Sequence, residues 1–399
     1  MRVLQINLVC GHGSTGRIAV DIANMLKANG DEAFIAYGSG TTDYLDSFRI
    51  TSDNEYRINS YFFSRILGLA GRGTRYGTRN LLKWIDRINP DVIHLHNIHS
   101  LCLNYPMLFR YVNKHHVPVV WTLHDCWPFT GGCAHFSAFE CEKWRTQCAH
   151  CKFYGTYHRK SLISTEKSTY KLKKKLFNSI DNLTIVPVSH WLDGLVRESF
   201  LKDKPHVVIQ NGIDLNVFKP TEVFVCQKVK QLKGLDKPIV LGVSSGWNNE
   251  KGLQEMIRLS QNPAYQVVLV GVQEGLKLPS EIIAINKTNS QEELVEYYSA
   301  ADVFVNPTWN DTFPTVNIES LACGTPVVTY KTDGSPEILD TNTGLVVNKG
   351  DYYELELGIE KILMRGKKEY SQHCIRRAKL FFNKDERYRD YLDIYHKVL

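Results

Sequence analysis

The residues with the clearest chemical use lie in one segment, NPTWNDTFPTVNIESLACGTPVVTYKTDGSPEIL, from Asn306 to Leu339. Its pattern predicts a strand, a loop, a helix, a second strand and a glycine-containing loop. Glu319 falls in the first turns of the helix, where its two carboxylate oxygens can accept hydrogen bonds from vicinal hydroxyls. The positive end of the helix dipole favours a diphosphate at the amides of Thr315, Val316 and Asn317. We therefore expect this one helix to hold a ribose and a diphosphate together.

A lysine stands in a comparable place earlier in the chain. In SSGWNNEKG, Lys251 follows a predicted strand and opens a predicted helix. A lysine there can neutralise the charge that develops on a departing nucleoside diphosphate, and loss of one such contact typically raises the barrier by ~3 kcal/mol. Taken alone, a lysine at a helix start is more often simply solvated. Together with the segment that contains Glu319, it is better interpreted as the stabiliser of the leaving group.

A glycine-rich loop follows the first predicted strand. In CGHGSTGR, Gly11, Gly13 and Gly16 have the spacing G-x-G-x-x-G and precede a predicted helix. Glycine permits tight turns, and the free N–H groups at a helix start attract phosphate. A dinucleotide site would also need an acidic residue about 20 residues further on, at the end of the second strand, where this chain has Ala-Tyr-Gly. Phosphate contact is the favoured interpretation, with a dinucleotide site and a purely structural turn as alternatives.

Histidines cluster at the ends of two later strands. His94, His96 and His99 lie in DVIHLHNIHS, and His124 lies at the end of VVWTLHD. Side chains alternate along a strand, so His94 and His96 are expected to point to the same face. Three clustered histidines are compatible with a metal, but a strand that directs one histidine to a substrate is the simpler interpretation. A single histidine at a strand end, taken alone, is more often structural.

Half of the ten cysteines lie in one stretch, HDCWPFTGGCAHFSAFECEKWRTQCAHC. Cys148 and Cys151 have the C-x-x-C spacing of a metal knuckle, and Cys133 and Cys141 would complete four thiolate ligands, with His135 as an alternative ligand. Three interpretations stay open, namely a structural zinc, a redox pair and free thiols. In a reducing cytoplasm disulfides are disfavoured. A zinc ion would brace the loop and perform no chemistry itself.

The elements that must position these residues alternate along the chain. Short apolar strands such as VLQINLV, DVIHLHN and VPVVWTLH alternate with helical patterns, which predicts a parallel sheet covered by helices on both faces. The pattern restarts beyond NGIDLNVFKP, with KPIVLGVSS, YQVVLVGV, DVFVNP and TPVVTY as later strands. We therefore expect an α/β protein of two doubly wound, Rossmann-like domains that face each other across a cleft. Ligands of such sheets lie outside the carboxyl ends of the strands, so the cleft is the expected site.

The expected domain boundary lies near Gly212. Residues 1–212 would form the first domain and residues 213–379 the second. Residues 380–399 end in a helical pattern that would cross back to complete the first domain. The apolar positions of that pattern are Tyr388, Tyr391, Leu392, Ile394 and Tyr395.

Length and composition agree with this organisation. A chain of 399 residues suits two domains, and 43% hydrophobic with 23% charged residues is the composition of a globular protein. A formal net charge of +6 is too small for a dedicated nucleic-acid binder. The start, MRVLQINLV, predicts a strand rather than a signal peptide, and no stretch reaches the ~18 apolar residues of a membrane span. We expect a cytoplasmic protein.

Two basic segments suit an anionic membrane surface. YFFSRILGLAGRGTRYGTRN, residues 61–80, interleaves aromatic and aliphatic residues with arginines, and KSTYKLKKKLF, residues 167–177, adds lysines. Such a mixture favours attachment to anionic lipid. A solvated helix and a core-facing stripe are the alternatives. Peripheral attachment to the inner face of the plasma membrane is thus one expectation.

Together these motifs resemble the retaining glycosyltransferases of the GT-B fold, in the large glycosyltransferase family 4, of the type that serves bacterial exopolysaccharide and lipopolysaccharide synthesis. The similarity covers nearly the whole chain, including the glycine-rich loop, DVIHLHN, NGID, the pair Lys251-Gly252 and the segment around Glu319. In that family two acidic residues separated by seven others contact the donor, and here they would be Asp311 and Glu319. The first is Asp where the family usually has Glu, and Gly246 stands where the family commonly has an arginine. The resemblance therefore implies that Lys251 and backbone amides neutralise the diphosphate.

The resemblance also assigns residues to the two substrates. It places His124 near the reacting carbon of the donor sugar, for a hydrogen bond to a sugar hydroxyl or to the developing charge. The expected catalytic residues are His124, Lys251, Asp311 and Glu319. The expected acceptor-side residues are His96, Asn97, His124 and Asp125. The expected donor-binding residues are Gly13, Gly16, Ser244, Lys251, Asp311, Pro314, Thr315, Val316, Asn317 and Glu319.

The leading functional hypothesis is transfer of a hexosyl unit from a UDP- or GDP-linked sugar to a saccharide or lipid-linked saccharide, with retention at the anomeric carbon. Residues 1–212 would then form the acceptor side, and residues 213–379 would bind the nucleotide sugar. Such enzymes usually need no metal or other cofactor for catalysis. The alternatives are a phosphorylase or epimerase of the same fold and a catalytically silent nucleotide-sugar-binding or scaffold protein.

Overall fold

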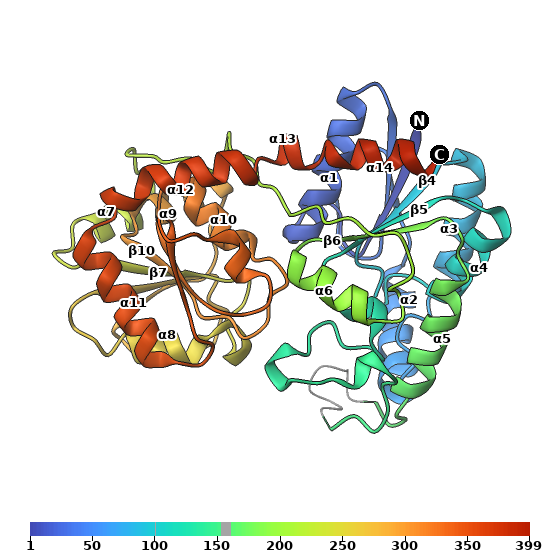
Figure 1. Cartoon of the computed structure of the whole chain (residues 1–399), viewed down its shortest axis with the longest axis horizontal. Coiled ribbons are helices and arrows are strands. Elements are labelled where there is room, and N and C mark those ends of the chain that lie inside the picture. Colours follow the sequence, from blue (N-terminus) through green and yellow to red (C-terminus); the bar gives the residue numbers. More distant parts are fainter. Residues whose placement is uncertain (100, 153–160) are drawn as a thin grey trace. The chain divides into compact units, whose positions relative to one another are not determined.

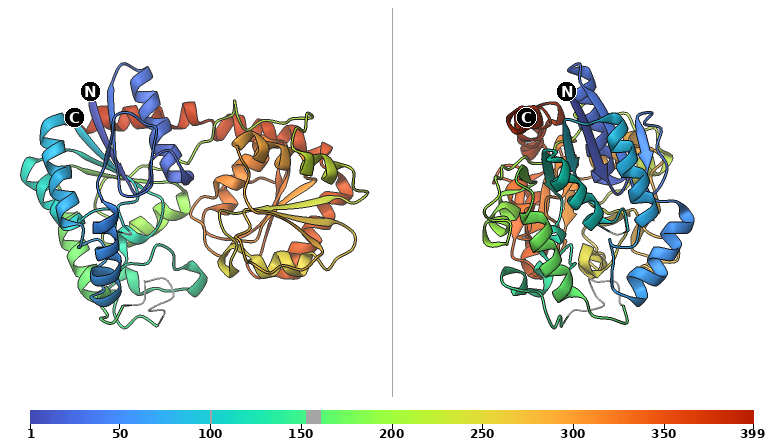
Figure 2. Two further views of the ribbon diagram at one scale, coloured as in Figure 1. Left: turned by 180° about the vertical axis from the view of Figure 1, so that it is seen from behind. Right: turned by 90° about the vertical axis from the view of Figure 1, so that its right-hand side faces the viewer.

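The computed structural model describes residues 1–99, 101–152 and 161–399, which form two compact units (Figure 1). One unit comprises Met1–Gln210 with Tyr388–Leu399, and the other comprises Asn211–Arg387. Each unit contains one six-stranded sheet, and every strand pair in both sheets is parallel. The predicted α/β class with two doubly wound domains is confirmed. Figure 2 shows helices on both faces of the sheets.

The first sheet has the strand order β3-β2-β1-β4-β5-β6. Its strands are β1 (Arg2–Asn7), β2 (Glu32–Tyr37), β3 (Ser47–Arg49), β4 (Val92–Leu95), β5 (Val119–Leu123) and β6 (Leu183–Pro187). Its main helices are α1 (Gly13–Ala28), α2 (Asp53–Ile58), η1 (Asn59–Ile66), α3 (Arg75–Ile88), α4 (Tyr105–His115), α5 (Glu166–Asn178) and α6 (His190–Glu198). The order reverses between β1 and β4, and ligands of doubly wound sheets bind at such a switch point.

The second sheet repeats this topology with the order β12-β11-β10-β7-β8-β9. Its strands are β7 (Ile239–Val243), β8 (Gln266–Val270), β9 (Ile282–Ile285), β10 (Val303–Asn306), β11 (Val327–Tyr330) and β12 (Gly344–Val347). Its helices are α7 (Gln227–Lys233), α8 (Leu253–Leu259), α9 (Gln291–Ala300), α10 (Thr315–Ala322), α11 (Tyr352–Arg365), α12 (Lys368–Phe381) and the short α13 (Lys384–Arg387). Its switch point lies between β7 and β10.

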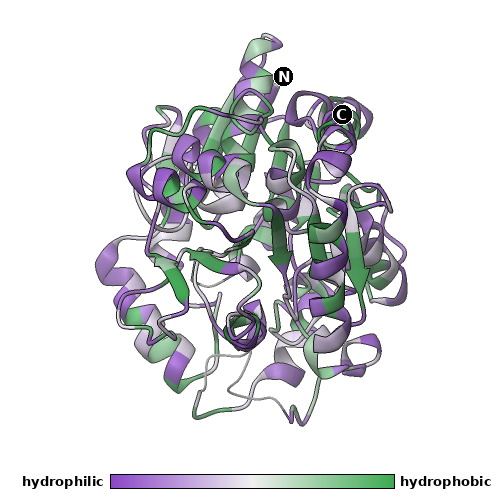
Figure 3. Cartoon of the chain, turned by 90° about the vertical axis from the view of Figure 1, so that its left-hand side faces the viewer, coloured by the Kyte–Doolittle hydropathy of each residue, from purple (hydrophilic) through white to green (hydrophobic). Residues whose placement is uncertain are grey.

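The central strands are continuous apolar runs because both of their faces are covered. All residues of β4, β5, β10 and β11 are buried, as expected for parallel sheets between helix layers. In Figure 3 the strands are mainly hydrophobic, whereas the helices carry polar residues on their outer faces. Across the described residues, no helix combines the length and the apolar character needed to cross a bilayer.

The final segment completes the first unit, as the sequence indicates, but it begins later than residue 380. Ile213 donates its amide to the carbonyl of Phe382 at 2.9 Å and accepts the amide of Lys384 at 3.1 Å, so these residues belong to the second unit. The predicted single helix is also divided into α13 and α14 (Asp390–Val398).

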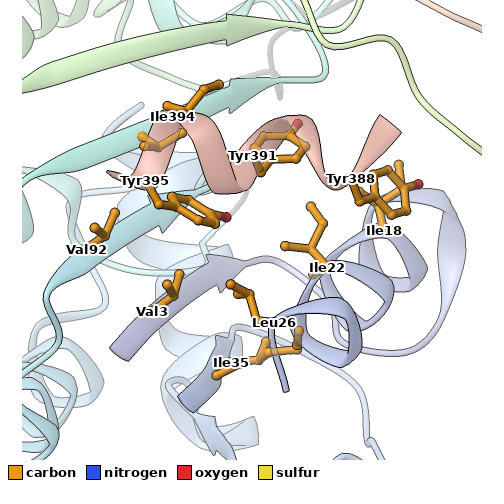
Figure 4. Close-up of a cluster of buried hydrophobic side chains, with 14 of the residues drawn as sticks. Val3, Ile18, Ile22, Leu26, Ile35, Val92, Tyr388, Tyr391, Ile394 and Tyr395 are labelled. Carbon is orange, nitrogen blue, oxygen red and sulfur yellow. The ribbon is translucent and has the colours of Figure 1, made fainter. Parts of the chain in front are cut away.

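The helix α14 fills the core of the first unit with one face. Its aromatic residues Tyr391 and Tyr395 lie against aliphatic side chains of α1 and β1, such as Ile22 and Val3 (Figure 4). Tyr388, Tyr391, Ile394 and Tyr395 are buried, whereas Leu392 packs against the cluster only partly buried. The sequence pattern therefore identified this face, because apolar residues recur at helical spacing.

Candidate functional site

The glycine-rich loop joins β1 to α1. Gly11 (φ 76°) and Gly13 (φ 64°) adopt left-handed backbone conformations, which favour glycine. A Cβ on Gly16 would lie 3.1 Å from the side chain of Val9, and the Gly16 carbonyl accepts the amide of Gly11 at 3.1 Å. The helix has neither a side-chain cap at His12 nor an acidic residue in its first turn. The loop thus has the tight turn and the uncapped helix start that an anion site requires.

A hydrogen-bonded chain of histidines lies at the ends of β4 and β5. His96 Nδ1 lies 3.0 Å from His124 Nε2, and His96 Nε2 lies 2.9 Å from Gln5 Oε1. The rings of His94 and His96 pack with centroids 4.1 Å apart, as expected for side chains on one face of a strand. His94 in turn contacts Tyr395 and Thr122, which link it to α14 and β5.

Burial keeps these histidines neutral. It lowers the pKa of His94 to about 3 and that of His124 to about 4, and it lowers the pKa of His96 well below the ordinary histidine value. Within the described part of the chain, no three His, Cys, Asp or Glu side chains come together as a group that could hold a metal ion. The metal alternative for the histidines therefore has no ligand set there.

The four expected acceptor-side residues differ in how deeply they are buried. His96 is 1% exposed, with both ring nitrogens in contacts, so it supports His124 from behind and does not border a ligand itself. Asn97 is partly buried, and its amide donates to Asn7. Asp125 accepts from Trp127 and lies 2.7 Å from His99 Nε2. Burial alone would raise the pKa of Asp125, but the charge and hydrogen bond of His99 contribute to a net lowering.

The predicted zinc residues Cys133, Cys141, Cys148 and Cys151 are all partly buried. Burial raises the pKa of Cys133 to about 12 and that of Cys148 to about 11, with contributions from the other thiols of the set. The four residues therefore share one neighbourhood. Among residues 1–99, 101–152 and 161–399, no group of three or more His, Cys, Asp or Glu side chains could hold a metal ion as arranged. The zinc ion stays a prediction, which metal analysis of the purified protein would test.

In the second unit, the two charged residues predicted to meet the donor form an ion pair. Lys251 Nζ lies 2.9 Å from Asp311 Oδ2. Lys251 ends the short turn Asn249–Lys251 and donates its backbone amide to the side chain of Asn248, which caps the turn. Asp311 follows β10 in the chain. The charge of Asp311 raises the pKa of Lys251 although burial opposes it, so the ammonium group is retained. Asp311 Oδ1 also accepts the amide of Phe313 at 3.4 Å.

Glu319 is 8% exposed and lies on α10. The hydroxyl of Tyr298 donates to Glu319 Oε2 at 2.9 Å. Burial, and secondly the charge of Glu319, raises the pKa of Tyr298 well above the ordinary tyrosine value, so the phenol keeps its proton and remains the donor. Asn306 at the end of β10 donates to Asn317 Oδ1 at 2.8 Å and ties α10 to the sheet.

The other expected donor residues lie around these two groups. Thr315 and Val316 begin α10 and are partly buried, and Pro314 precedes them without a side-chain cap. Ser244 Oγ contacts the backbone of Gly246, the position where a family arginine was expected. The structure thus places the predicted residues of the second unit beside the carboxyl ends of β7 and β10, at the switch point of the sheet.

Sequence reasoning missed three residues of these sites. Tyr298 and Gln5 lie within a helix and a strand, respectively, where they are indistinguishable from packing residues. Asp333 accepts the amide of Asp311 at 3.0 Å and has φ of 48°, a left-handed conformation that costs energy in a residue other than glycine. Its only signal in the sequence is its place in the Gly-containing loop after β11.

Comparisons with known proteins agree with this geometry. The family model described as Glycosyltransferase Family 4 matches residues 15–217, and the model described as Glycosyl transferases group 1 matches residues 227–381. The chain belongs to glycosyltransferase family 4. It is therefore a glycosyltransferase, with the two-domain GT-B fold that the sequence indicates.

Individual relatives of this family 4 chain are distant. It is 25% identical over 380 residues to the putative colanic acid biosynthesis glycosyl transferase WcaC of Escherichia coli K12, with 89% of each chain covered. Among solved structures it is similar to sucrose-phosphate synthase from Thermosynechococcus elongatus, with a TM-score of 0.73, 17% identity, and coverage of 100% of this chain and 99% of that one. It is also similar to Anabaena HepE in complex with UDP, with a TM-score of 0.68, 16% identity and full coverage of both chains. At these identities the solved structures establish the fold alone.

Proposed function

We propose that this glycosyltransferase transfers a hexosyl unit from a UDP- or GDP-linked sugar to a saccharide or lipid-linked saccharide, with retention of the anomeric configuration, in cell-surface polysaccharide synthesis. The observation that carries the proposal is the charge arrangement of the second unit. A buried carboxylate, Glu319, and an ammonium group, Lys251, lie at the switch point of one sheet, next to an uncapped helix start. The colanic acid relative and the UDP complex of HepE support the substrate classes.

In this proposal the second unit binds the nucleoside diphosphate. Glu319 accepts hydrogen bonds from the ribose hydroxyls, while Tyr298 holds its other oxygen. Lys251 and the amides of Thr315 and Val316 neutralise the phosphates. Because Asp311 already pairs with Lys251 at 2.9 Å, it also keeps the ammonium group in place before the donor binds.

The proposed reaction needs no redox partner. The bond between the anomeric carbon and the phosphate oxygen breaks, and the acceptor hydroxyl oxygen bonds to the same face of that carbon. The departing phosphate oxygen takes the proton of the acceptor hydroxyl, and the products are the extended saccharide and the nucleoside diphosphate. Lys251 stabilises the charge of the leaving group, and His124 in the first unit contacts the sugar.

The decisive experiment compares Glu319→Ala with the matched control Glu281→Ala, an exposed acidic residue of the same unit. Loss of a charge-assisted hydrogen bond costs about 1.5–3 kcal/mol, so Glu319→Ala should weaken UDP or GDP binding about ten- to a hundredfold in calorimetry. The control should bind as the wild type does. Equal affinities of Glu319→Ala and the wild type would remove the donor assignment. A panel of UDP- and GDP-sugars with polysaccharide acceptors would then identify the transferred sugar.

We further propose that an apolar and basic surface on the first unit contacts anionic lipid. Its apolar side chains are exposed, with Tyr61 66%, Phe62 47% and Leu162 84% accessible. The amide of Leu162 donates to the carbonyl of Arg65 at 3.2 Å, so Leu162 lies next to the segment that contains Tyr61 and Phe62. Exposed basic residues close to these side chains in the sequence include Arg57, Arg65, Lys167 and Lys171. This combination suits a bilayer that carries negative charge.

Vesicle sedimentation would test this lipid contact. The double variant Phe62→Ser and Leu162→Ser should lose most of the binding to phosphatidylglycerol vesicles that the wild type shows at low salt. Leu45→Ser removes a side chain that is 93% exposed elsewhere on the same unit, and it should bind as the wild type does. Equal sedimentation of the wild type with neutral and anionic vesicles, or of all three proteins with anionic vesicles, would exclude this surface.

A further inference from the structure

Gln5 lies on β1 and is fully buried beneath the histidine chain. Its Nε2 donates to the carbonyl of Ala19 at 2.7 Å, which fixes the orientation of the amide. The opposite atom, Oε1, therefore faces His96 Nε2 at 2.9 Å. A carbonyl oxygen only accepts hydrogen bonds, so the proton of His96 must be on Nε2.

The proton on His96 Nε2 determines which ring nitrogen of His124 carries a proton. His96 is neutral because burial lowers its pKa well below the ordinary value, so it carries a single proton and its Nδ1 has a lone pair. His124 Nε2 lies 3.0 Å from that atom and must donate to it. Since burial also keeps His124 neutral, with a pKa of about 4, its Nδ1 carries the lone pair of the ring.

We propose that Gln5 is a positioning residue that sets the tautomer of His124 through His96, with the proton of His124 on Nε2 and the lone pair on Nδ1. The Nε2 proton of His124 is used inside the protein. A ring in this state recognises a hydroxyl group that donates its proton, and it cannot donate to an anionic phosphate oxygen. The tautomer follows from the hydrogen-bond geometry and the neutral state of both rings, whereas the identity of the ligand as a sugar rests on the proposed function.

A neighbouring set of contacts provides the control. Thr122 Oγ1 lies 2.8 Å from His94 Nε2 and 2.9 Å from the hydroxyl of Tyr391. Thr122 is as deeply buried as Gln5 and is also hydrogen-bonded to a histidine. Its contacts, however, lead to α14 and to His94, and they do not include Gln5 or His96. Loss of its hydroxyl should affect stability without changing the proton positions of His124.

Nitrogen NMR of the unliganded wild-type protein, labelled with ¹⁵N-histidine, is the first test. Two-bond proton–nitrogen correlations distinguish the protonated from the unprotonated ring nitrogen, and the variant His124→Gln identifies the signals of His124. We expect the proton on Nε2 at neutral pH. A proton on Nδ1 of His124 would overturn the proposal. This measurement needs no variant of Gln5 that folds and no active assay.

The second test compares Gln5→Met with Thr122→Val. Gln5→Met should leave His124 as a mixture of both tautomers and lower kcat/KM for saccharide transfer about tenfold, the factor that corresponds to one ordinary hydrogen bond. Thr122→Val should keep the wild-type tautomer and transfer rate, although it lowers the melting temperature. If both variants leave the tautomer of His124 unchanged, Gln5 does not set it. If the tautomer behaves as expected but the wild type transfers no sugar, the proposed function fails while the role of Gln5 stands.

Discussion

At the residue scale, the donor assignment depends on how Glu319 is held. A buried carboxylate is costly unless it is hydrogen-bonded, and the phenol of Tyr298 supplies one such bond at 2.9 Å. Tyr298 is itself completely buried, so its hydroxyl has a structural reason to face the carboxylate. The pair therefore positions one oxygen of Glu319.

The substitution Tyr298→Phe tests this pair. It removes only the hydroxyl, so we expect a loss of about 1–3 kcal/mol of stability, because a charged acceptor loses its partner in a buried site. We also expect nucleotide affinity to fall about tenfold, as Glu319 becomes less well oriented. Tyr297→Phe is the matched control, since Tyr297 is equally buried and its hydroxyl lies 3.8 Å from Cys226 Sγ. Chemical denaturation and calorimetry should show both effects for Tyr298→Phe alone, and equal behaviour of the two variants would contradict the assignment.

The same residues show what the sequence could predict at this scale. The sequence singled out Glu319, Lys251 and His124 because they lie at strand ends or helix starts, where polar residues in an α/β pattern point to function. Gln5 and Tyr298 were not, because a polar residue inside a strand or helix acquires its partner only through tertiary contacts. His96 was expected at the surface of the site but is buried, and its contact with Gln5 spans 91 positions of the chain.

At the element scale, a buried lysine secures the segment that follows His124. Lys173 on α5 is completely buried, and its Nζ donates to the carbonyls of Trp127 and Thr130 at 2.6 and 3.3 Å. The same atom lies 3.4 Å from the ring centroid of Trp127. The sequence placed Lys173 in a basic stripe for a membrane, and that interpretation is wrong for this lysine because it points inward.

Replacement of Lys173 should therefore cost stability. Lys173→Met leaves two buried carbonyls without their donor, so we expect a loss of about 1–3 kcal/mol in urea unfolding. Its neighbour Lys174 is exposed, and Lys174→Met should change stability by less than about 0.5 kcal/mol. Similar unfolding midpoints for the two variants would show that the carbonyls find other partners.

At the scale of the whole molecule, the chain builds its first unit from two distant pieces. The inner strands of both units were predictable from alternating apolar runs, whereas no such run predicted the edge strands β3, β9 and β12. The right-handed connection of parallel strands restricts the topologies that such strands can form. The start of the returning segment was not predictable to within a few residues. It depends on hydrogen bonds between Ile213 and residues 382–384, which no local pattern reveals.

This division predicts different behaviour for the two units as separate fragments. Residues 211–387 are continuous and contain all six strands of their sheet, so we expect them to fold alone and unfold cooperatively. Residues 1–210 lack α14, which contributes three fully or almost fully buried side chains. These are Tyr391, Ile394 and Tyr395. Burial of a large apolar side chain contributes about 1.5–3 kcal/mol, so their loss approaches the 5–15 kcal/mol that stabilises a typical domain.

Circular dichroism with urea unfolding of three fragments would check this expectation. Residues 1–210 alone should keep helical signal but lose the near-ultraviolet signal of fixed aromatic side chains, since the packing around α14 is missing. Residues 1–210 joined to residues 388–399 by a short Gly-Ser linker should recover that signal and a cooperative transition. The linker can be short because Gly212 and Lys384 lie in contact, where the chain leaves and returns. The same midpoint for the fragment with and without α14 would mean that the helix covers the unit without completing its core.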